Sequence, residues 1–208
     1  MDIQELFDRL DRHRGSFPGD LVAEIIARRE EVIPRFLAIL EDVDTNPEPW
    51  LMDDGRMVHI YAMYLLALFR ETRAYPLLVR IFSRPGEFPF DLAGDVVTED
   101  LGRILASVSG GDLRGLSALI ENEQANEYVR ALAMESMVSL VTTGQLTRDE
   151  VMAYFLHLFP ETGAKARRTV GWLGLCLRRS LAARSYRRTW PCLRRRPGGH
   201  RQHRLAGH

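Results

Sequence analysis

A run of apolar residues at 57–69, MVHIYAMYLLALF, limits what this chain can fold into more than any other feature. Apart from His59 it holds no acidic or basic residue, so a helix formed here is apolar nearly all round. Such a helix has to be covered on every side by other parts of the protein. The run is also well short of the roughly 20 residues that a membrane span needs. We therefore expect a buried central helix.

The sequence around this run also has helical periodicity. Asp20, Asn126 and Thr147 with Glu150 are placed to cap helices, and Pro34 suits a first helical turn. No stretch alternates apolar and polar residues as a half-buried strand does, so the sequence predicts an all-α protein. Apolar residues return at the spacing of one helix face in 2–13, 20–31, 34–42, 74–83, 96–109, 112–122, 126–144 and 147–159.

Part of this helical pattern repeats along the chain. Residues 65–81 match residues 104–120 without a gap at an offset of 39, and a third copy around Met137 and Val141 matches less tightly. Helix pairs at a period of about 35–45 residues are typical of HEAT-like solenoids, in which antiparallel helix pairs stack. We predict such an α-solenoid; the alternative is an irregular helical bundle whose pairs match by chance. The paired positions are Leu65 and Ile104, Ala67 and Ala106, Phe69 and Val108, Leu77 and Leu116, and Ile81 and Ile120.

Three blocks of sequence, HIYAMYLLALFRETRAYPLLVR, GDVVTEDLGRILASV and NEYVRALAMESMVSLV, resemble the bacterial domain-of-unknown-function family 1186. The segment IARREEVIPRFLAILED near the N-terminus fits the same family. The resemblance runs from about residue 1 to about residue 160. It implies a HEAT-like helical fold in a bacterial cytoplasmic protein. That family has no assigned activity, so the resemblance implies no catalytic residues.

The overall net charge of zero conceals two segments of opposite charge. Residues 1–161 hold all 28 acidic residues and 15 arginines, a net charge of −13, whereas residues 162–208 hold 13 basic residues and no acid. We expect a helical-repeat domain over 1–160 and an irregular basic tail over 161–208. The negative body repels nucleic acid and anionic membranes. Both cysteines lie in the tail and the N-terminus lacks the order of a signal peptide, so we expect a cytoplasmic protein without a membrane span.

The histidine of the apolar run is one candidate for chemistry. His59 lies near Asp53 and Asp54 in the sequence, and one hypothesis is that it is a base oriented by a carboxylate. The other interpretation is a packed residue with one hydrogen-bonded ring nitrogen, which is the commoner state of a lone histidine on a buried helix. The neighbouring acids Glu99 and Asp100 are explained by the first turn of a helix, where carboxylates complement the helix dipole.

Two sets of residues have part of a metal-site pattern. Asp42, Asp44, Asn46 and Asp53 occupy positions 1, 3, 5 and 12 of an EF-hand register. Pro47 stands at the sixth position, where that loop needs glycine, so we interpret the stretch as an acidic turn between helices. Two cysteines and two histidines in the C-terminal segment are candidates for a zinc site, but their spacing fits no compact zinc site. Glycine-rich phosphate loops and hydrolase motifs are absent from the sequence. We expect no catalytic, cofactor or metal residues, and a protein that is not an enzyme. The zinc candidates are Cys176, Cys192, His200 and His203.

The C-terminal stretch RRSLAARSYRRTWPCLRRR allows three interpretations. In a genuine arm, five arginines contact the phosphates of a nucleic acid, and Tyr186 and Trp190 stack on its bases. In the second interpretation the arm folds back on the acidic body. In the third, the tail is read in an altered frame: only Lys165 among 28 basic residues is a lysine, which indicates a GC-rich gene, and such a gene read one base out of register yields a mixture rich in arginine, proline, glycine, cysteine, tryptophan and histidine. The arginines are Arg187, Arg188, Arg194, Arg195 and Arg196.

These observations favour a non-enzymatic helical-repeat protein that binds or scaffolds another protein. The negative body makes a basic segment the expected feature of that unknown partner. The alternative is a nucleic-acid-binding accessory protein that uses the arginine-rich arm. In every case we expect residues from about 180 onward to be poorly ordered, since they lack the apolar periodicity of the body.

Overall fold

The structure is a computed structural model that describes residues 1–12, 17–53 and 55–158. Within these residues the chain forms twelve helices and no β-strand, so the all-α prediction is confirmed. The helices are α1 (Ile3–Leu10), α2 (Gly19–Ala27), α3 (Arg29–Thr45), α4 (Glu48–Leu51), α5 (Val58–Phe69), α6 (Ala74–Phe82), α7 (Phe88–Ala93), α8 (Val96–Glu99), α9 (Leu101–Ser109), α10 (Leu113–Glu121), α11 (Glu127–Thr142) and α12 (Arg148–Leu158).

Helix α5 lies at the centre, as its apolar sequence predicts. Eight of its twelve residues are buried, and α1, α3 and α9 all pack against it. Arg29, at the start of α3, closes one end of this packing: its guanidinium lies 5.3 Å from the ring of Phe69 and donates to the Phe69 carbonyl at 3.0 Å. The helix that most needed cover therefore receives it from both the N-terminal and the middle parts of the chain.

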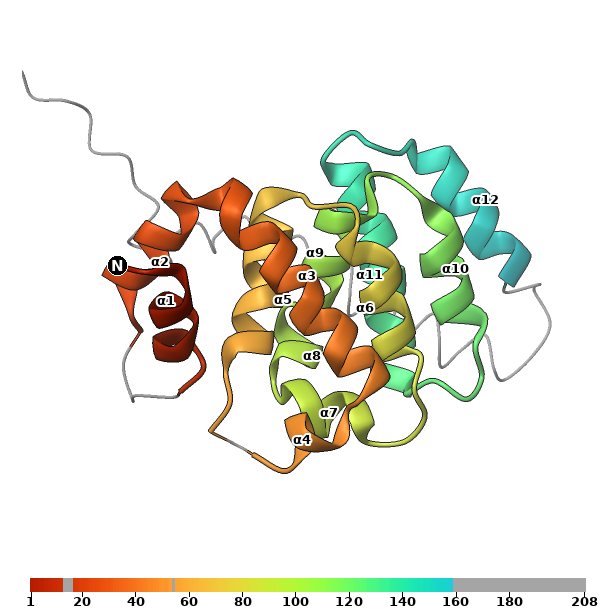
Figure 1. The fold of residues 1–208 in the computed structure, drawn as a ribbon. Coiled ribbons are helices and arrows are strands. Elements are labelled where there is room, and N and C mark those ends of the chain that lie inside the picture. The colour runs from red at the N-terminus through yellow and green to blue at the C-terminus, as the bar shows by residue number, and fades with distance from the viewer. Residues whose placement is uncertain (13–16, 54, 159–208) are drawn as a thin grey trace, which may run out of the picture.

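The longer helices form two layers (Figure 1). Helices α3, α6, α10 and α12 follow one another across the molecule, and α5, α9 and α11 lie behind them. The most extensive contacts pair α9 with α11, α10 with α11 and α3 with α5. Helices α1 and α2 stand at the end of the molecule opposite α12, while the short helices α4, α7 and α8 lie together along one edge.

The internal match at an offset of 39 residues corresponds to equivalent positions in the two layers. All five matched pairs are buried in both copies, from Leu65 and Ile104 to Ile81 and Ile120. The first helix of each matched copy, α5 or α9, ends at a residue in the left-handed conformation: Arg70 with a φ of 54° and Gly110 with a φ of 59°. The sequence repeat is therefore a repeat of burial and of helix termination.

Several predicted helix ends are confirmed. The side chain of Asn126 accepts a hydrogen bond from the Tyr128 N–H at 3.0 Å, which caps α11. Thr147 and Glu150 form the predicted capping box: the Thr147 N–H donates to the Glu150 carboxylate at 2.8 Å, and the Glu150 N–H donates to the Thr147 hydroxyl at 3.2 Å.

Other predicted boundaries are wrong. Asp20 does not cap α2, which begins one residue earlier at Gly19; its carboxylate lies in the first turn, where it complements the helix dipole. Pro34 lies inside α3 rather than at its start, because the buried face of α3 continues through Val32 and Phe36. The single helix predicted over 96–109 divides into α8 and α9 at Asp100, whose side chain is held by α5.

A glycine allows α6 and α10 to approach closely. The hydroxyl of Tyr75 on α6 donates to the Asp112 carbonyl at 2.7 Å and accepts from the Leu116 N–H at 2.8 Å. A Cβ atom at Gly115 would stand 2.7 Å from that hydroxyl and 2.9 Å from Val79. Burial raises the pKa of Tyr75 to about 12, which keeps the hydroxyl protonated as a donor at neutral pH.

We predict that Gly115→Ala destabilises the protein. The added methyl group forces Tyr75 away from its two backbone partners, and overpacking of this kind costs about 1–3 kcal/mol. Alanine recovers up to about 1 kcal/mol of helix propensity, which leaves a net loss of up to about 2 kcal/mol in the free energy of unfolding. Urea denaturation measures this loss. Gly19→Ala is the control, since its new Cβ atom meets its nearest neighbour at 3.8 Å; equal stability of the two variants would contradict the prediction.

Candidate interaction groove

An apolar groove of about 560 Å³ lies between α2, α5 and α9. Its volume is within the range of about 300–1,000 Å³ that ligand pockets span. Helix α5 forms the floor, α2 one wall and α9 the other. The lining residues are Phe17, Gly19, Val22, Ala23, Ile26, Met57, Ile60, Tyr61, Tyr64, Leu65, Ala67, Leu68, Asp100, Arg103, Ile104 and Ser107.

The floor of the groove is the part of α5 that its neighbours leave uncovered. Ile60, Tyr61 and Tyr64 are partly buried, and Leu68 keeps 47% of its surface exposed. A helix that is apolar nearly all round has no polar face to turn outward, so its uncovered side presents large apolar groups. Exposed apolar surface gathered in a concavity marks a binding site more often than single exposed apolar residues do.

The α9 wall is fixed to this floor by polar contacts. The Tyr64 hydroxyl donates to the Asp100 carboxylate at 2.5 Å, and Asp100 also forms an ion pair with Arg103. Burial and then this contact with Asp100 raise the pKa of Tyr64 well above its ordinary value, so the phenol stays protonated. At the other end of the wall, the Ser107 hydroxyl donates to the Ala67 carbonyl at 2.7 Å.

The α2 wall is apolar on its groove side and is held from its other side. Val22, Ala23 and Ile26 line the groove. The N-terminal ammonium group of Met1 lies 3.4 Å from the Glu24 carboxylate, and Arg28, just after α2, donates to the Met1 carbonyl at 2.8 Å.

This arrangement is suited to holding an apolar segment. Asp100 already receives Tyr64 and Arg103, so the carboxylate in the groove is engaged by protein groups. The rest of the lining is dominated by aliphatic and aromatic side chains. An apolar ligand would bury its surface over α5.

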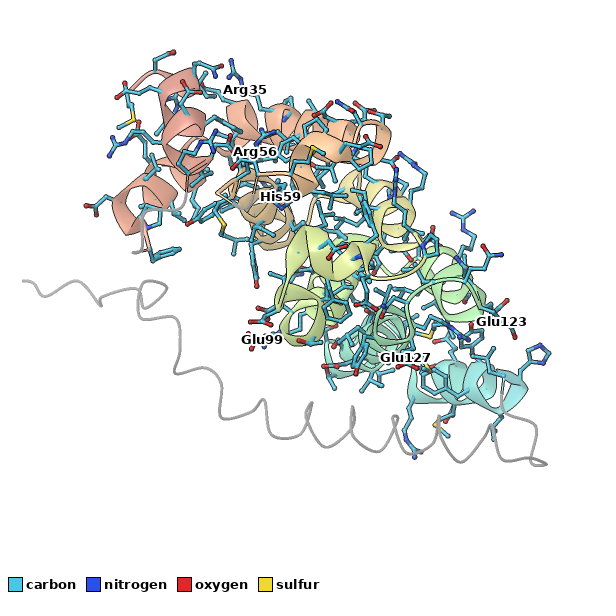
Figure 2. The ribbon with its side chains drawn as sticks, turned by 90° about the horizontal axis from the view of Figure 1, so that it is seen from below. Arg35, Arg56, His59, Glu99, Glu123 and Glu127 are labelled. Atoms are coloured by element: carbon cyan, nitrogen blue, oxygen red, sulfur yellow. The ribbon has the colours of Figure 1, made fainter. Side chains whose placement is uncertain are left out.

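His59 lies outside the groove, on the opposite side of α5. It is 4% exposed, its Nε2 lies 2.9 Å from the Leu92 carbonyl oxygen, and its ring meets that of Trp50 edge-on at 5.4 Å. Figure 2 shows it enclosed among the helices, whereas Glu99 projects at the outer edge. Burial argues against the hypothesis of a carboxylate-oriented base: Asp53 pairs instead with Arg12 at 2.7 Å, the His59 Nδ1 atom has no hydrogen-bond partner among the described residues, and Asp54 lies outside those residues. The packed interpretation is confirmed.

The acidic residues of the partial EF-hand pattern are bound to other protein groups. Asp42 accepts a hydrogen bond from the Trp50 indole at 2.8 Å, and Asp44 pairs with Arg80 at 2.6 Å. Both lie in the last turns of α3 rather than in a loop. Within residues 1–12, 17–53 and 55–158, no group of histidine, cysteine and carboxylate side chains is arranged to hold a metal ion.

The candidates in the basic tail lie outside the described residues. These are the arginines proposed to bind nucleic acid, Arg187, Arg188, Arg194, Arg195 and Arg196, and the zinc candidates Cys176, Cys192, His200 and His203. They stay predictions. Among the helices that the structure describes, none is both long and apolar enough to cross a membrane.

The groove residues were missed by sequence reasoning, although one signal pointed to them. The run at 57–69 predicts a helix covered on every side, whereas one face of α5 stays open, and the sequence does not indicate which face that is. Ile60, Tyr64 and Leu68 recur every four residues and Tyr61 lies three residues before Tyr64, so they share one face of α5. Only the placement of α2 and α9 shows that this face is open.

Comparison with known proteins places the chain among uncharacterised bacterial proteins. The model of the family described as "Protein of unknown function (DUF1186)" matches residues 1–177. An uncharacterised protein of Chlamydia muridarum and one of Chlamydia trachomatis are each 41% identical over 158 residues, or 76% of this chain. The match spans 63% and 62% of the length of these two relatives. No solved structure matches the chain.

We predict that His59 makes the stability of the protein depend on pH. Burial lowers the pKa of His59 and outweighs the opposing effect of the hydrogen bond to the Leu92 carbonyl. Unfolded histidine titrates near pH 6.5. The unfolded state therefore binds more protons than the folded state below that pH, and the free energy of unfolding falls as the pH falls from about 7 to 5. Urea denaturation across this range should give a smaller pH slope for His59→Gln, whose amide N–H replaces the Nε2–H donor; an unchanged slope would contradict the prediction.

Proposed function

The chain belongs to the DUF1186 family of proteins of unknown function, and we propose that it is a non-enzymatic helical-repeat protein that binds another protein. We propose further that its helices form a HEAT-like solenoid. Two observations support that arrangement: the two layers of helices, and the burial of all five residue pairs that the 39-residue offset relates. In a solenoid, successive helices of one layer create extended grooves suited to partner segments.

The groove between α2, α5 and α9 is the observation that carries the proposal. Its floor runs from Met57 to Leu68, a length of about 16 Å at the rise of an α-helix. That length suits an amphipathic helix of two to three turns or a short extended segment, which is how apolar grooves commonly receive partner proteins.

The charge of the body indicates the chemistry of the partner. Residues 1–161 carry a net charge of −13, and the exposed carboxylates of Asp20 and Glu99 stand on α2 and α8 beside the groove. A partner segment with basic residues on either side of an apolar core would be attracted and oriented by these charges. We place the protein in the cytoplasm as part of the same proposal, since residues 1–161 contain no cysteine with which to form a disulfide.

We predict that Leu68→Glu weakens partner binding without unfolding the protein. Short random peptides displayed on phage are selected on the immobilised full chain, and the enriched sequences should place arginine or lysine beside apolar residues. Leu68→Glu puts a charge on the groove floor and should weaken these peptides by at least about tenfold, or 1.4 kcal/mol. Fluorescence anisotropy of the labelled peptides measures the affinity, and circular dichroism verifies the fold.

Leu156→Glu is the matched control. Leu156 is 63% exposed on α12, at the other end of the molecule, and does not line the groove. The same substitution there should leave peptide affinity unchanged. Peptides that bind both variants equally, or a selection that enriches none, would contradict the proposed function.

The arginine-rich arm supports the alternative, a nucleic-acid-binding accessory protein. The arm clusters Arg187, Arg188, Arg194, Arg195 and Arg196 near two aromatic residues, whereas the body is too acidic to attract phosphates.

We predict that any nucleic-acid affinity resides in this arm. A chain ending at residue 177 should lose binding to single-stranded RNA. The affinity of the full chain should fall steeply with salt, by somewhat less than about one log unit per log unit of salt for each phosphate that the arm neutralises. Filter binding at several salt concentrations measures both. Affinity that survives the truncation would rule out the arm as the binding element.

A further inference from the structure

We propose that the groove is occupied, in the free protein, by the chain's own apolar segment at residues 169–177. This inference rests on the proposed function, because the segment would occupy the same groove as the proposed partner protein. The segment reads TVGWLGLCL and contains no charged residue. It lies within the part of the chain that the family model matches, and the match ends at its last residue.

The chemistry of this segment is that expected of a groove ligand. Trp172, Leu173 and Leu175 supply large apolar groups for the aliphatic and aromatic lining over α5. Nine residues in a helix span about 13.5 Å, which fits the groove floor of about 16 Å. Exposing the apolar segment or the open face of α5 to water is unfavourable in free energy. Docking the segment on α5 would remove both apolar surfaces from water.

Charge supports the same pairing. Arginine pairs flank the segment on both sides, Arg167 with Arg168 and Arg178 with Arg179. The body that they would meet has a net charge of −13, whereas residues 162–208 carry +13. Exposed carboxylates on the helices beside the groove, Asp20 and Glu99, would attract the flanking guanidinium groups.

The connection is long enough for the segment to dock within one molecule. Helix α12 ends at Leu158, and the eleven residues from there to Thr169 reach about 36 Å when extended. Helix α12 packs on α11 and α11 packs on α9, one wall of the groove, and each step between packed helices is about 8–10 Å, so the reach exceeds the distance from α12 to that wall. Tethering at this length gives the segment an effective concentration on the order of 1 mM, well above that of an ordinary partner in solution.

Intramolecular disulfide trapping tests the proposal in the full chain. Cys176 lies in the segment, and Cys192→Ser removes the other native thiol. In that background, a second cysteine is introduced in the groove by Ala23→Cys or Ser107→Cys. Ala38→Cys, an exposed alanine on α3 in the opposite layer, is the matched control. The proteins are oxidised with oxidised glutathione, and intramolecular disulfides are read by non-reducing electrophoresis and mass spectrometry.

We expect the two groove variants to form the monomeric disulfide at least about tenfold faster than the Ala38→Cys control. Equal rates at the three positions, or no disulfide at any of them, would overturn the proposal. A disulfide-linked dimer formed only by the groove variants would place the segment in a second copy and overturn the intramolecular assignment. Circular dichroism confirms that each variant is folded before oxidation.

A second measurement separates this inference from the proposed function. Trp172→Glu should release the segment and tighten the binding of the selected groove peptides by about tenfold or more, since the tethered competitor is gone. If trapping fails while the peptides still bind, the cis occupant is wrong and the groove still binds partners. If trapping succeeds but no peptide binds either wild type or Trp172→Glu, the segment completes the fold and the proposed function is wrong.

Discussion

The fold depends on the need to cover α5. A helix with apolar residues on every side is stable in water only when other helices surround it, and this requirement recruits α1, α3 and α9 from distant parts of the chain. The two layers follow from that packing, with α3 on one side of α5 and α9 on the other. The neighbouring helices leave one face of α5 uncovered, and this face forms the groove. The floor of the groove therefore consists of apolar side chains that the described helices leave accessible.

Local sequence signals predicted the helical class and several helix ends correctly, because those depend on neighbouring residues. Asn126 and the pair Thr147 and Glu150 act within one turn, and their bonds formed as expected. Pro34 failed as a boundary signal because burial of a whole helix face outweighs one missing backbone donor. The groove could not be predicted, since it depends on how far apart α2 and α9 stand, and that distance is set by packing between residues some eighty positions apart in the chain.

The carboxylates of this acidic protein divide into those engaged within the fold and those that define its surface. Asp42, Asp44 and Asp53 resembled a cation site in the sequence but are bound to Trp50, Arg80 and Arg12. Asp100 holds the α9 wall through Tyr64. The exposed acids, Glu99 among them, then dominate the field that an approaching molecule meets. The apolar groove lies in a negative surface, so we expect it to prefer cationic amphiphiles to purely apolar ligands.

The polar bond between Ser107 and Ala67 has a mechanical consequence. Together with the contact between Tyr64 and Asp100 it ties one side of the groove to its floor at two points, whereas α2 is tied through Glu24 and Arg28 to the N-terminus of the chain. In the proposed complex, a wide partner segment would displace the N-terminal helices, while these two bonds would keep the spacing of α5 and α9. The N-terminal side of the groove is therefore the side that we expect to adapt to partner segments of different size.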